Sequence, residues 1–354
     1  MAAYKDEEQK TWYVQFYYRD WQGQNKKKKK RGFPTKKEAQ EWEREFLNKQ
    51  QANPDMAFGS LVDLYMEDMV HRLRKSTMEN KKFVINLKIL PFFKELPINE
   101  IKATQIRKWQ NELMNNSSNY SETYIKTINN QLVAIFNYAV KFYDLKGNPC
   151  HKAGSIGKKN ADEMQFWTKD EFLCFLPTIS DKPQSKAAFE TLYWTGLRIG
   201  ELMALTPKDI DFDNKTLSIN KSYQRLNKED IITDPKTPKS NRSIALPEFV
   251  CNDLQEYIGK LYDLKLDDRI FPFTKFFLHH EMDRGCKKSG VKRIRLHDLR
   301  HSHASLLIEM GFSPLLIAER LGHEKVETTL NTYSHLYPNK HSQIADKLND
   351  LGKE

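Results

Sequence analysis

The N-terminal part of the chain alternates apolar and polar positions in the manner of a β-strand. In the segment TWYVQFYYR, every second residue is apolar and belongs to one face: Trp12, Val14, Phe16 and Tyr18. This period of two predicts a strand over residues 11–19. Thr35 and Glu38 then form the capping-box pattern of a following helix. We predict a small sheet with one helix over residues 1–54.

From residue 58 to residue 148, the apolar positions recur with the period of an α-helix. Hydroxyl residues that favour helix starts lie at Ser60, Ser76, Thr104 and Ser121. We expect about four or five helices in this second domain, residues 58–148. The stretch that follows, GNPCHKAGSIGKKNADEM, loses the period and gathers Gly, Pro, Lys and Asn. We predict an exposed linker over residues 149–165.

A third domain, residues 166–354, mixes helical and strand-like patterns. It opens on a capping box, Thr168 with Glu171, and helical periodicity continues to about residue 205. Strand-like segments separated by turn residues follow at residues 216–222, 231–233 and 242–246, and helical patterns then resume. The whole chain is therefore predicted to be mostly α with small β-sheets, an α+β protein.

Length and composition describe a soluble protein of several domains. The chain has 354 residues, 39% of them apolar and 29% charged, and no apolar run reaches the roughly 18 residues that a transmembrane helix needs. The opening MAAYKDEEQK lacks the apolar region of a secretory signal, so we expect a cytoplasmic protein. The cysteines lie far apart, which favours reduced thiols over a disulfide framework or a zinc site: Cys150, Cys174, Cys251 and Cys286.

The net charge favours a polyanionic partner. Lys and Arg number 57 against 47 Asp and Glu, a formal charge of +10, and residues 1–50 hold 13 basic against 8 acidic side chains. Much of this excess lies in one basic run. Such a run is either a solvated loop or localisation-like tract, or a phosphate-contacting strand or loop anchored by aromatic neighbours. The candidate DNA-binding residues are Lys27, Lys28, Lys29, Lys30 and Arg31.

The densest group of polar residues is the segment RLHDLRHSH. If a helix begins at His297, then His297, Arg300 and His301 share one face at i, i+3 and i+4 spacing. The segment also has the His-x-x-x-His spacing of zinc-binding helices. However, Asp298 replaces the glutamate base of that motif, and the charge of Arg300 would repel a divalent cation. The segment is a cationic site or a helix start whose histidines only form hydrogen bonds, and we predict no metal.

The segment SPLLIAERLGHEKVETTLNTYSHLY predicts two short helices separated by a glycine. Ser313, followed by proline, is typical of a helix start, and Gly322 is typical of a helix end. His323 then lies in the loop before a second helix around residues 326–333. This pattern also fits a helix-turn-helix, so a non-catalytic DNA-binding regulator is the rival interpretation. The second helix, however, has few base-reading side chains and carries the acidic Glu327.

Two motifs upstream are weaker when taken alone. In TGLRIGEL, Arg198 follows a glycine at a helix start, and Glu201 stands three residues on, where it can orient the guanidinium. A pair of this kind is commonly structural. In PKTPKSNR, Lys236 lies in a proline-rich turn between two predicted strands, so a β-hairpin would hold it at its tip.

Together these motifs, in this order and spacing, resemble the tyrosine recombinase family, the phage-type integrases, over about residues 58–336. Less closely, the N-terminal residues resemble the arm-site-binding domain that integrases of temperate phages and conjugative transposons carry. The resemblance implies an arm-binding domain, a helical core-binding domain and a mixed α/β catalytic domain. It also assigns a catalytic set, with Tyr333 as nucleophile: Arg198, Lys236, His297, Arg300, His323 and Tyr333. Chemistry alone leaves Lys239 open against Lys236, and Tyr337 against Tyr333.

The resemblance further implies a site-specific recombinase that integrates and excises a mobile element through a 3′-phosphotyrosyl intermediate. Such an enzyme needs neither ATP nor metal, and the sequence has no GxxxxGK[ST] segment and no carboxylate cluster typical of two-metal cleavage. We therefore expect no cofactor. Competing functions are a DNA-binding protein without turnover and the relaxation of supercoils by a type IB topoisomerase mechanism.

The partners that the resemblance implies are double-stranded DNA and further copies of the chain. The DNA would carry core-type and arm-type sites, and a homotetramer on it would exchange strands through a Holliday junction. A C-terminal helix over about residues 340–351 would pack on a neighbouring copy. An excision factor or a host DNA-bending protein is a candidate accessory partner, and no membrane is expected.

Overall fold

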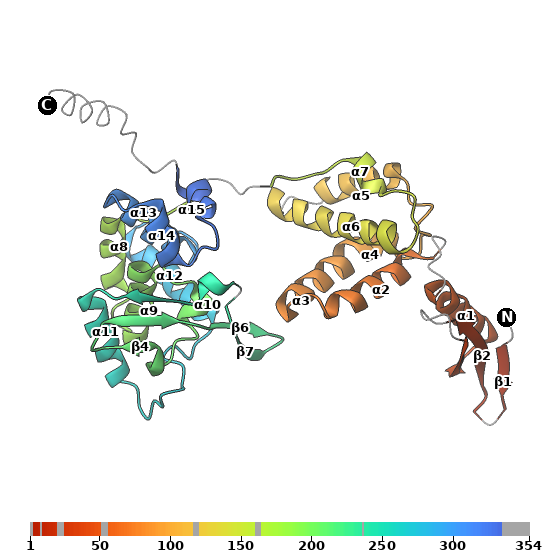
Figure 1. The fold of residues 1–354 in the computed structure, drawn as a ribbon, viewed down its shortest axis with the longest axis horizontal. Helices are drawn as coiled ribbons and strands as arrows, with labels where there is room; N and C mark the ends of the chain where they lie inside the picture. Colours follow the sequence, from red (N-terminus) through yellow and green to blue (C-terminus); the bar gives the residue numbers. More distant parts are fainter. Residues whose placement is uncertain are drawn as a thin grey trace. The chain divides into compact units, whose positions relative to one another are not determined.

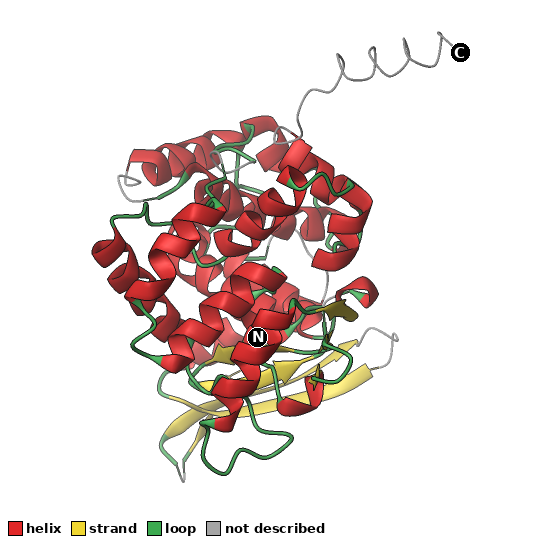
Figure 2. Cartoon of the chain, turned by 90° about the vertical axis from the view of Figure 1, so that its left-hand side faces the viewer, coloured by secondary structure: helices red, strands yellow, loops and turns green. Residues whose placement is uncertain are grey.

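The computed structural model divides the chain into two compact units, Met1–Asp162 and Glu163–Glu354 (Figure 1). It describes residues 3–7, 9–19, 25–50, 56–115, 120–159, 164–235 and 237–334. Helices predominate, and short strands form small sheets, so the predicted α+β fold is confirmed (Figure 2). Over these ranges, no helix combines the length and the apolar character needed to cross a membrane.

The first unit begins with an antiparallel three-stranded sheet, in the order β1 (Ala3–Asp6), β2 (Thr11–Arg19) and β3 (Asn25–Phe33). The predicted strand over residues 11–19 is β2, and the basic run lies in strand β3 rather than in a loop. Helix α1 (Lys36–Gln50) follows and packs on β2. At its start the Glu38 N–H donates to Thr35 Oγ1 at 3.2 Å, as half of the predicted capping box requires.

A group of helices in the same unit encloses its own hydrophobic core. Its elements are α2 (Phe58–Val70), α3 (Lys75–Val84), η1 (Ile85–Ile89), α4 (Leu90–Phe93), α5 (Ala103–Asn115), α6 (Glu122–Phe142) and α7 (Pro149–Ala153). Phe58 is fully buried at the centre, where its ring lies 5.7 Å from that of Phe93 and 5.4 Å from that of Phe136. The start predicted at Ser121 is confirmed, because its side chain accepts from the Tyr124 N–H.

The beginning of the predicted linker belongs to this helical core, which corrects the boundary at residue 148. Asn148 caps α7 by accepting from the Cys150 N–H at 2.8 Å, and Pro149 occupies the first helical position. Cys150, Ala153 and Ile156 are buried in the core. The proline and glycines that suggested a linker mark the start and end of a short helix instead. The packing of the apolar side of this helix makes it part of the core. A helix of five residues is too short to show the apolar period that would have predicted it from the sequence.

In the second unit, helices surround a larger hydrophobic core. They are α8 (Lys169–Phe175), η2 (Leu176–Thr178), α9 (Pro183–Thr195), α10 (Ile199–Leu202), η3 (Pro207–Asp209), α11 (Glu248–Gly259), α12 (Lys275–Ser289), α13 (Asp298–Glu309), α14 (Pro314–Leu321) and α15 (Val326–Tyr333). Both bonds of the predicted capping box between Thr168 and Glu171 are present at the start of α8. Helix α9 is buried on nearly all sides, and Tyr193 on it stacks on Phe172 with ring centroids 3.9 Å apart.

The strands of this unit form two small sheets. One has the order β4 (Ile210–Asp211), β5 (Thr216–Ile219), β8 (Arg242–Ala245), and the other is the hairpin β6 (Ser222–Leu226) with β7 (Glu229–Thr233). The single strand predicted over residues 216–222 is therefore wrong, since it divides between β5 and β6. The chain leaves the first sheet at Asn220 and Lys221, where Lys221 Nζ lies 2.6 Å from Asp209 Oδ2 and this ion pair holds the segment between the two strands. A 3-10 turn, η4 (Pro238–Ser240), connects β7 to β8.

Candidate active site

Arg198 lies in a tight turn between two helices of the second unit. Helix α9 ends at Gly196, whose φ of +67° is left-handed, and a Cβ there would meet the ring of His303 at 2.7 Å. The turn makes Arg198 the cap of α10. Its Nη1 donates to Glu201 Oε1 at 2.7 Å and its Nη2 to the Gly322 carbonyl at 3.3 Å. Because 36% of the side chain is exposed, Arg198 can reach a ligand.

Arg300 is the buried member of the cationic group. It is 3% exposed on α13, where Nη1 donates to the Gly196 carbonyl at 2.8 Å and Nη2 to the Leu321 carbonyl at 2.6 Å. These two carbonyls fix the plane of the guanidinium. Burial and the charge of Arg198 lower the pKa of Arg300 to about 9. Two neighbouring cations, one of them desolvated, form a site that an anion stabilises.

Glu201 and Arg242 form an ion pair that supports this site from within. Glu201 is 5% exposed and accepts from Arg198 and from Arg242, whose Nη2 lies 3.0 Å from Oε2. Burial by itself would raise the pKa of Glu201, but Arg242 and Arg198 hold that pKa below its ordinary value. Sequence pattern alone assigns no role to Arg242. Its one signal is its place as the last residue of the lysine motif PKTPKSNR.

The two histidines of the predicted catalytic set, His297 and His323, both lie close to the positive charges of Arg300 and Arg198. His297 precedes α13, and burial followed by the charges of Arg300 and Arg198 lowers its pKa. His323 follows Gly322, and its Nδ1 lies 2.7 Å from Thr329 Oγ1. Burial, again with the charge of Arg300, lowers the pKa of His323 to about 3. Both rings are therefore neutral at pH 7 in the protein without DNA.

Tyr333 is buried at the end of α15, in contact with His301 and close enough to Arg300 for the charge of that arginine to act on it. It is 1% exposed, and its Oη lies 2.6 Å from Nδ1 of His301. Burial raises the pKa of Tyr333 to about 12, although the charge of Arg300 acts in the opposite direction. His301 was expected on the same helix face as His297 and Arg300, but outside the catalytic set. The structure brings it into contact with the predicted nucleophile.

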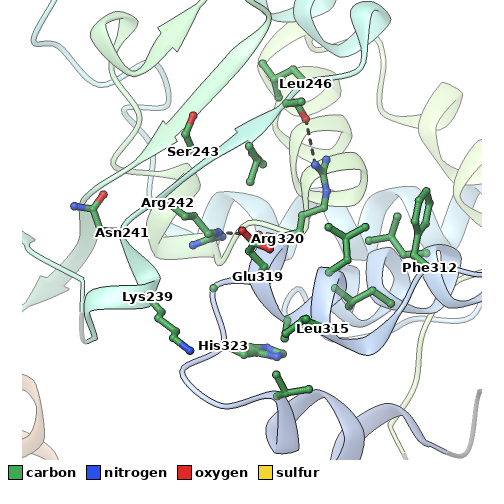
Figure 3. A pocket seen from close by; sticks show the side chains of 18 of the residues that line it. Lys239, Asn241, Arg242, Ser243, Leu246, Phe312, Leu315, Glu319, Arg320 and His323 are labelled. Carbon is green, nitrogen blue, oxygen red and sulfur yellow. Dashed lines mark hydrogen bonds between the residues drawn. The ribbon is translucent and has the colours of Figure 1, made fainter.

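The predicted lysine, Lys236, lies outside the described residues, as does Tyr337. The alternative, Lys239, is described in η4 and lines a pocket together with Arg242 and His323 (Figure 3). Arg242 Nε donates to the Arg320 carbonyl in this pocket at 2.8 Å. The pocket continues toward an apolar wall that includes Leu315.

The rival interpretations of the motifs can be compared with this geometry. Among the residues that the structure describes, no group of three or more His, Cys, Asp or Glu side chains is arranged to hold a metal ion. Helix α15, the recognition helix of the helix-turn-helix interpretation, points Thr329 and Tyr333 inward, to His323 and His301. The described residues of the predicted set thus converge: Arg198, His297, Arg300, His323 and Tyr333. Chemically, the cluster can bind an anion at two guanidinium groups and present a phenol to it.

Comparison with known proteins gives the family. Three family profiles match the chain: the arm DNA-binding domain at residues 2–50, the phage integrase N-terminal SAM-like domain at residues 57–114, and the phage integrase family at residues 166–340. The ICEBs1 integrase of Bacillus subtilis is 33% identical over 339 residues, which cover 90% of each chain. The chain belongs to the phage integrase family. It is an integrase, a tyrosine recombinase whose activity is site-specific recombination, and the predicted family and function are confirmed.

Solved structures of integrases share the fold. The Tn1549 transposon integrase, in complex with transposon right end DNA, gives a TM-score of 0.68 at 21% identity and covers 84% of this chain and 100% of its own. A lambda integrase dimer bound to a core site gives a TM-score of 0.61 at 18% identity and covers 96% of this chain and 95% of its own. At these identities the likeness concerns the fold alone.

In this integrase, the N-terminal sheet divides the predicted basic run between two faces. On the open face, Lys27 Nζ lies 5.8 Å from the centre of the Tyr17 ring and Lys29 Nζ lies 4.6 Å from that of Tyr13. On the face that carries α1, Lys28 Nζ lies 5.5 Å from the Phe46 ring and Lys30 Nζ 4.6 Å from the Trp42 ring. Arg31 lies 5.7 Å from Tyr13, on the open face. Alternation along β3 therefore gives the open face Lys27, Lys29 and Arg31.

Proposed function

We propose that this integrase cleaves and rejoins DNA strands by attack of Tyr333 on a phosphodiester, through a 3′-phosphotyrosyl intermediate. The observation that carries the proposal is the convergence of a buried tyrosine with two fixed arginines. Tyr333 and Arg300 influence each other's pKa. Arg300 donates to the carbonyls of Gly196 and Leu321, and Arg198 donates to the adjacent carbonyl of Gly322. Integration and excision of a mobile element would follow from two such exchanges.

Arg198 and Arg300 are proposed to bind the non-bridging oxygens of the phosphate. Negative charge on these oxygens increases at the transition state, and a charge that is already held in place stabilises it without reorganisation. Arg300 is fixed by two backbone carbonyls, and Arg198 by Glu201. His297 and His323 would add hydrogen-bond donors once a bound phosphate restores their affinity for protons.

The departing 5′ oxygen needs a proton, and Lys236 is the proposed general acid. This role rests on family resemblance and on the place of Lys236 between β7 and η4. Lys239 is the alternative, because it follows three positions later in the sequence and lines the pocket beside His323.

The reaction is proposed to need neither ATP nor a metal ion. The phosphotyrosyl bond retains the energy of the cleaved strand, so a free 5′ hydroxyl can displace the tyrosine directly. The DNA partner would be held by the helical domain and the second unit at core-type sites, and by the open face of the arm sheet at arm-type sites. We further propose that the protein acts as a homotetramer on DNA, with an accessory excision or DNA-bending protein, and that it is cytoplasmic.

The test is a denaturing gel of the purified protein with nicked duplexes made from the termini of the element, with and without EDTA. The expected result is a protease-sensitive, slowly migrating adduct that persists in EDTA and disappears in Tyr333→Phe. Tyr337→Phe is the matched control and should keep the adduct. Salt-sensitive DNA binding without an adduct on any terminus would favour a binding protein that lacks turnover, and loss of the adduct in EDTA would contradict the metal-free reaction.

A further inference from the structure

The hydroxyl of Tyr333 has a specific acceptor. The side chain is 1% exposed, so its O–H must find a partner inside the protein. Within the described ranges, the structure places Nδ1 of His301 at this oxygen, 2.6 Å away. A neutral imidazole accepts through the nitrogen that carries no hydrogen. We assign His301 the tautomer with its hydrogen on Nε2, because in that form Nδ1 accepts from the buried O–H of Tyr333.

The other basic groups of the site are engaged elsewhere or cannot accept. Both terminal nitrogens of Arg300 donate to the carbonyls of Gly196 and Leu321, and a guanidinium has no acceptor. His323 uses Nδ1 toward Thr329 Oγ1. The ring of His297 stands edge-on to His301 with centroids 5.2 Å apart. Geometry alone thus distinguishes His301 from the two histidines of the predicted set.

The electrostatic environment of this pair changes with the substrate. Burial, then His297, lowers the pKa of His301 to about 4, whereas burial raises the pKa of Tyr333 to about 12, so the proton stays on the phenol in the free protein. A phosphate anion at the two arginines would offset positive charge and raise the proton affinity of His301. The charged and titratable groups that act on His301 are His297, Asp298, Arg295, Arg300, Tyr333 and His323.

We propose that His301 is a catalytic residue that takes the proton of Tyr333 during strand cleavage and returns it during religation, an inference that rests on the recombination mechanism proposed above. In cleavage, the Tyr333 O–H bond breaks and the proton moves to His301 Nδ1, while the phenolate oxygen bonds to phosphorus. The bond from phosphorus to the 5′ oxygen breaks, and that oxygen keeps the electron pair and receives a proton from the general acid. Religation reverses each transfer. Nucleophile and base lie on α15 and α13 of one chain.

The test is the single-turnover rate of adduct formation on a nicked duplex from the element's termini, followed from pH 6 to pH 10. His301→Gln can still accept the phenol hydrogen bond but cannot take the proton. We expect it to lower the rate at pH 7 by about 10²- to 10³-fold, with DNA affinity little changed. The deficit should shrink as pH rises, because hydroxide then removes the proton. Added imidazole should partly restore His301→Ala. His279→Ala, an exposed histidine on α12, is the control and should match the wild type.

Each alternative result has a separate meaning. A wild-type rate and pH profile in His301→Gln would reduce His301 to a positioning residue, and so would a deficit that stays constant with pH and resists imidazole. Thermal unfolding of each variant shows whether the substitution impairs folding. If it does, the pH dependence of the cleavage rate in His301→Gln still separates proton transfer from positioning, because a folding defect does not make the deficit shrink as pH rises. An adduct that persists in Tyr333→Phe, or no adduct with the wild type, would overturn the proposed function itself rather than the role of His301 alone.

Discussion

Two basic regions of this integrase carry positive charge in opposite ways. On the open face of the arm sheet, Lys27 and Lys29 are exposed and lie over tyrosine rings. In the second unit, Arg300 is 3% exposed and is held by two backbone carbonyls. Exposed lysines attract phosphates from many directions and are screened by salt, whereas a fixed guanidinium stabilises charge at one place. The number of basic residues therefore indicates the kind of partner. Whether each charge is held in place indicates whether it attracts DNA or stabilises charge during the reaction.

The largest effect is expected at the fixed charge. Arg300→Lys keeps a cation but cannot donate to the Gly196 and Leu321 carbonyls in the same plane. We expect the single-turnover cleavage rate to fall by about 10³-fold, with DNA affinity within about tenfold of the wild type. Arg284→Lys is the control, since Arg284 pairs with Asp181 and Glu281 outside this network. A cleavage rate within tenfold of the wild type would mean that fixation contributes little.

The second prediction concerns the carboxylate that holds Arg198 and Arg242. Glu201→Gln keeps the shape of the side chain and removes the charge that compensates the buried Arg242. We expect the free energy of unfolding of the second unit to fall by about 3 kcal/mol. The measurement is denaturant unfolding, with Glu248→Gln as the control. Glu248 pairs with Lys215 on the surface, with 70% of its side chain exposed, and should change stability by less than about 1 kcal/mol.

The third prediction tests a buried neutral group beside the site. His303 is 3% exposed and accepts from Arg320 Nε, and burial with the charge of Arg320 lowers its pKa to about 3. The unfolded state binds a proton at a higher pH than the folded state, so stability is lost as pH falls below about 6.5. At pH 5 the loss should be about 2 kcal/mol.

Urea unfolding at pH 7 and pH 5 measures this loss. The difference between the two pH values should be smaller in His303→Gln, because glutamine does not titrate, and unchanged in His279→Ala. An equal difference in all three proteins would show that other groups cause the acid sensitivity.

The smallest effect is expected on the arm sheet, and it tests the exposed side of the comparison. The double variant Lys27→Ala, Lys29→Ala should weaken binding to duplex DNA from the element's ends by about tenfold and reduce the salt slope by about 1.8, or about 0.9 for each phosphate contact. The matched variant Lys28→Ala, Lys30→Ala removes the same charge from the α1 face. Filter binding at several salt concentrations distinguishes the two, and equal losses would show that net charge matters and the face does not.

Several elements could be predicted because their signals are local. The capping box of Thr168 with Glu171, the start at Ser121 and the strand over residues 11–19 depend on spacings of a few residues. Other expectations were wrong where packing prevails over composition. Pro149 begins and Gly154 ends a short helix of the core, and the strand-like segment over residues 216–222 divides between two sheets.

The sequence by itself determined the family, the order of the motifs and the identity of the cationic residues, because each motif is a short pattern of residue types at fixed spacing. Only the tertiary structure decided which of these residues meet. Tyr333 forms a hydrogen bond with His301, 32 positions away, and Arg242 forms an ion pair with Glu201, 41 positions away. The reason is physical: such pairs form when helices and strands pack, and a hydrogen bond is made or lost over less than an ångström, which no spacing along the chain specifies.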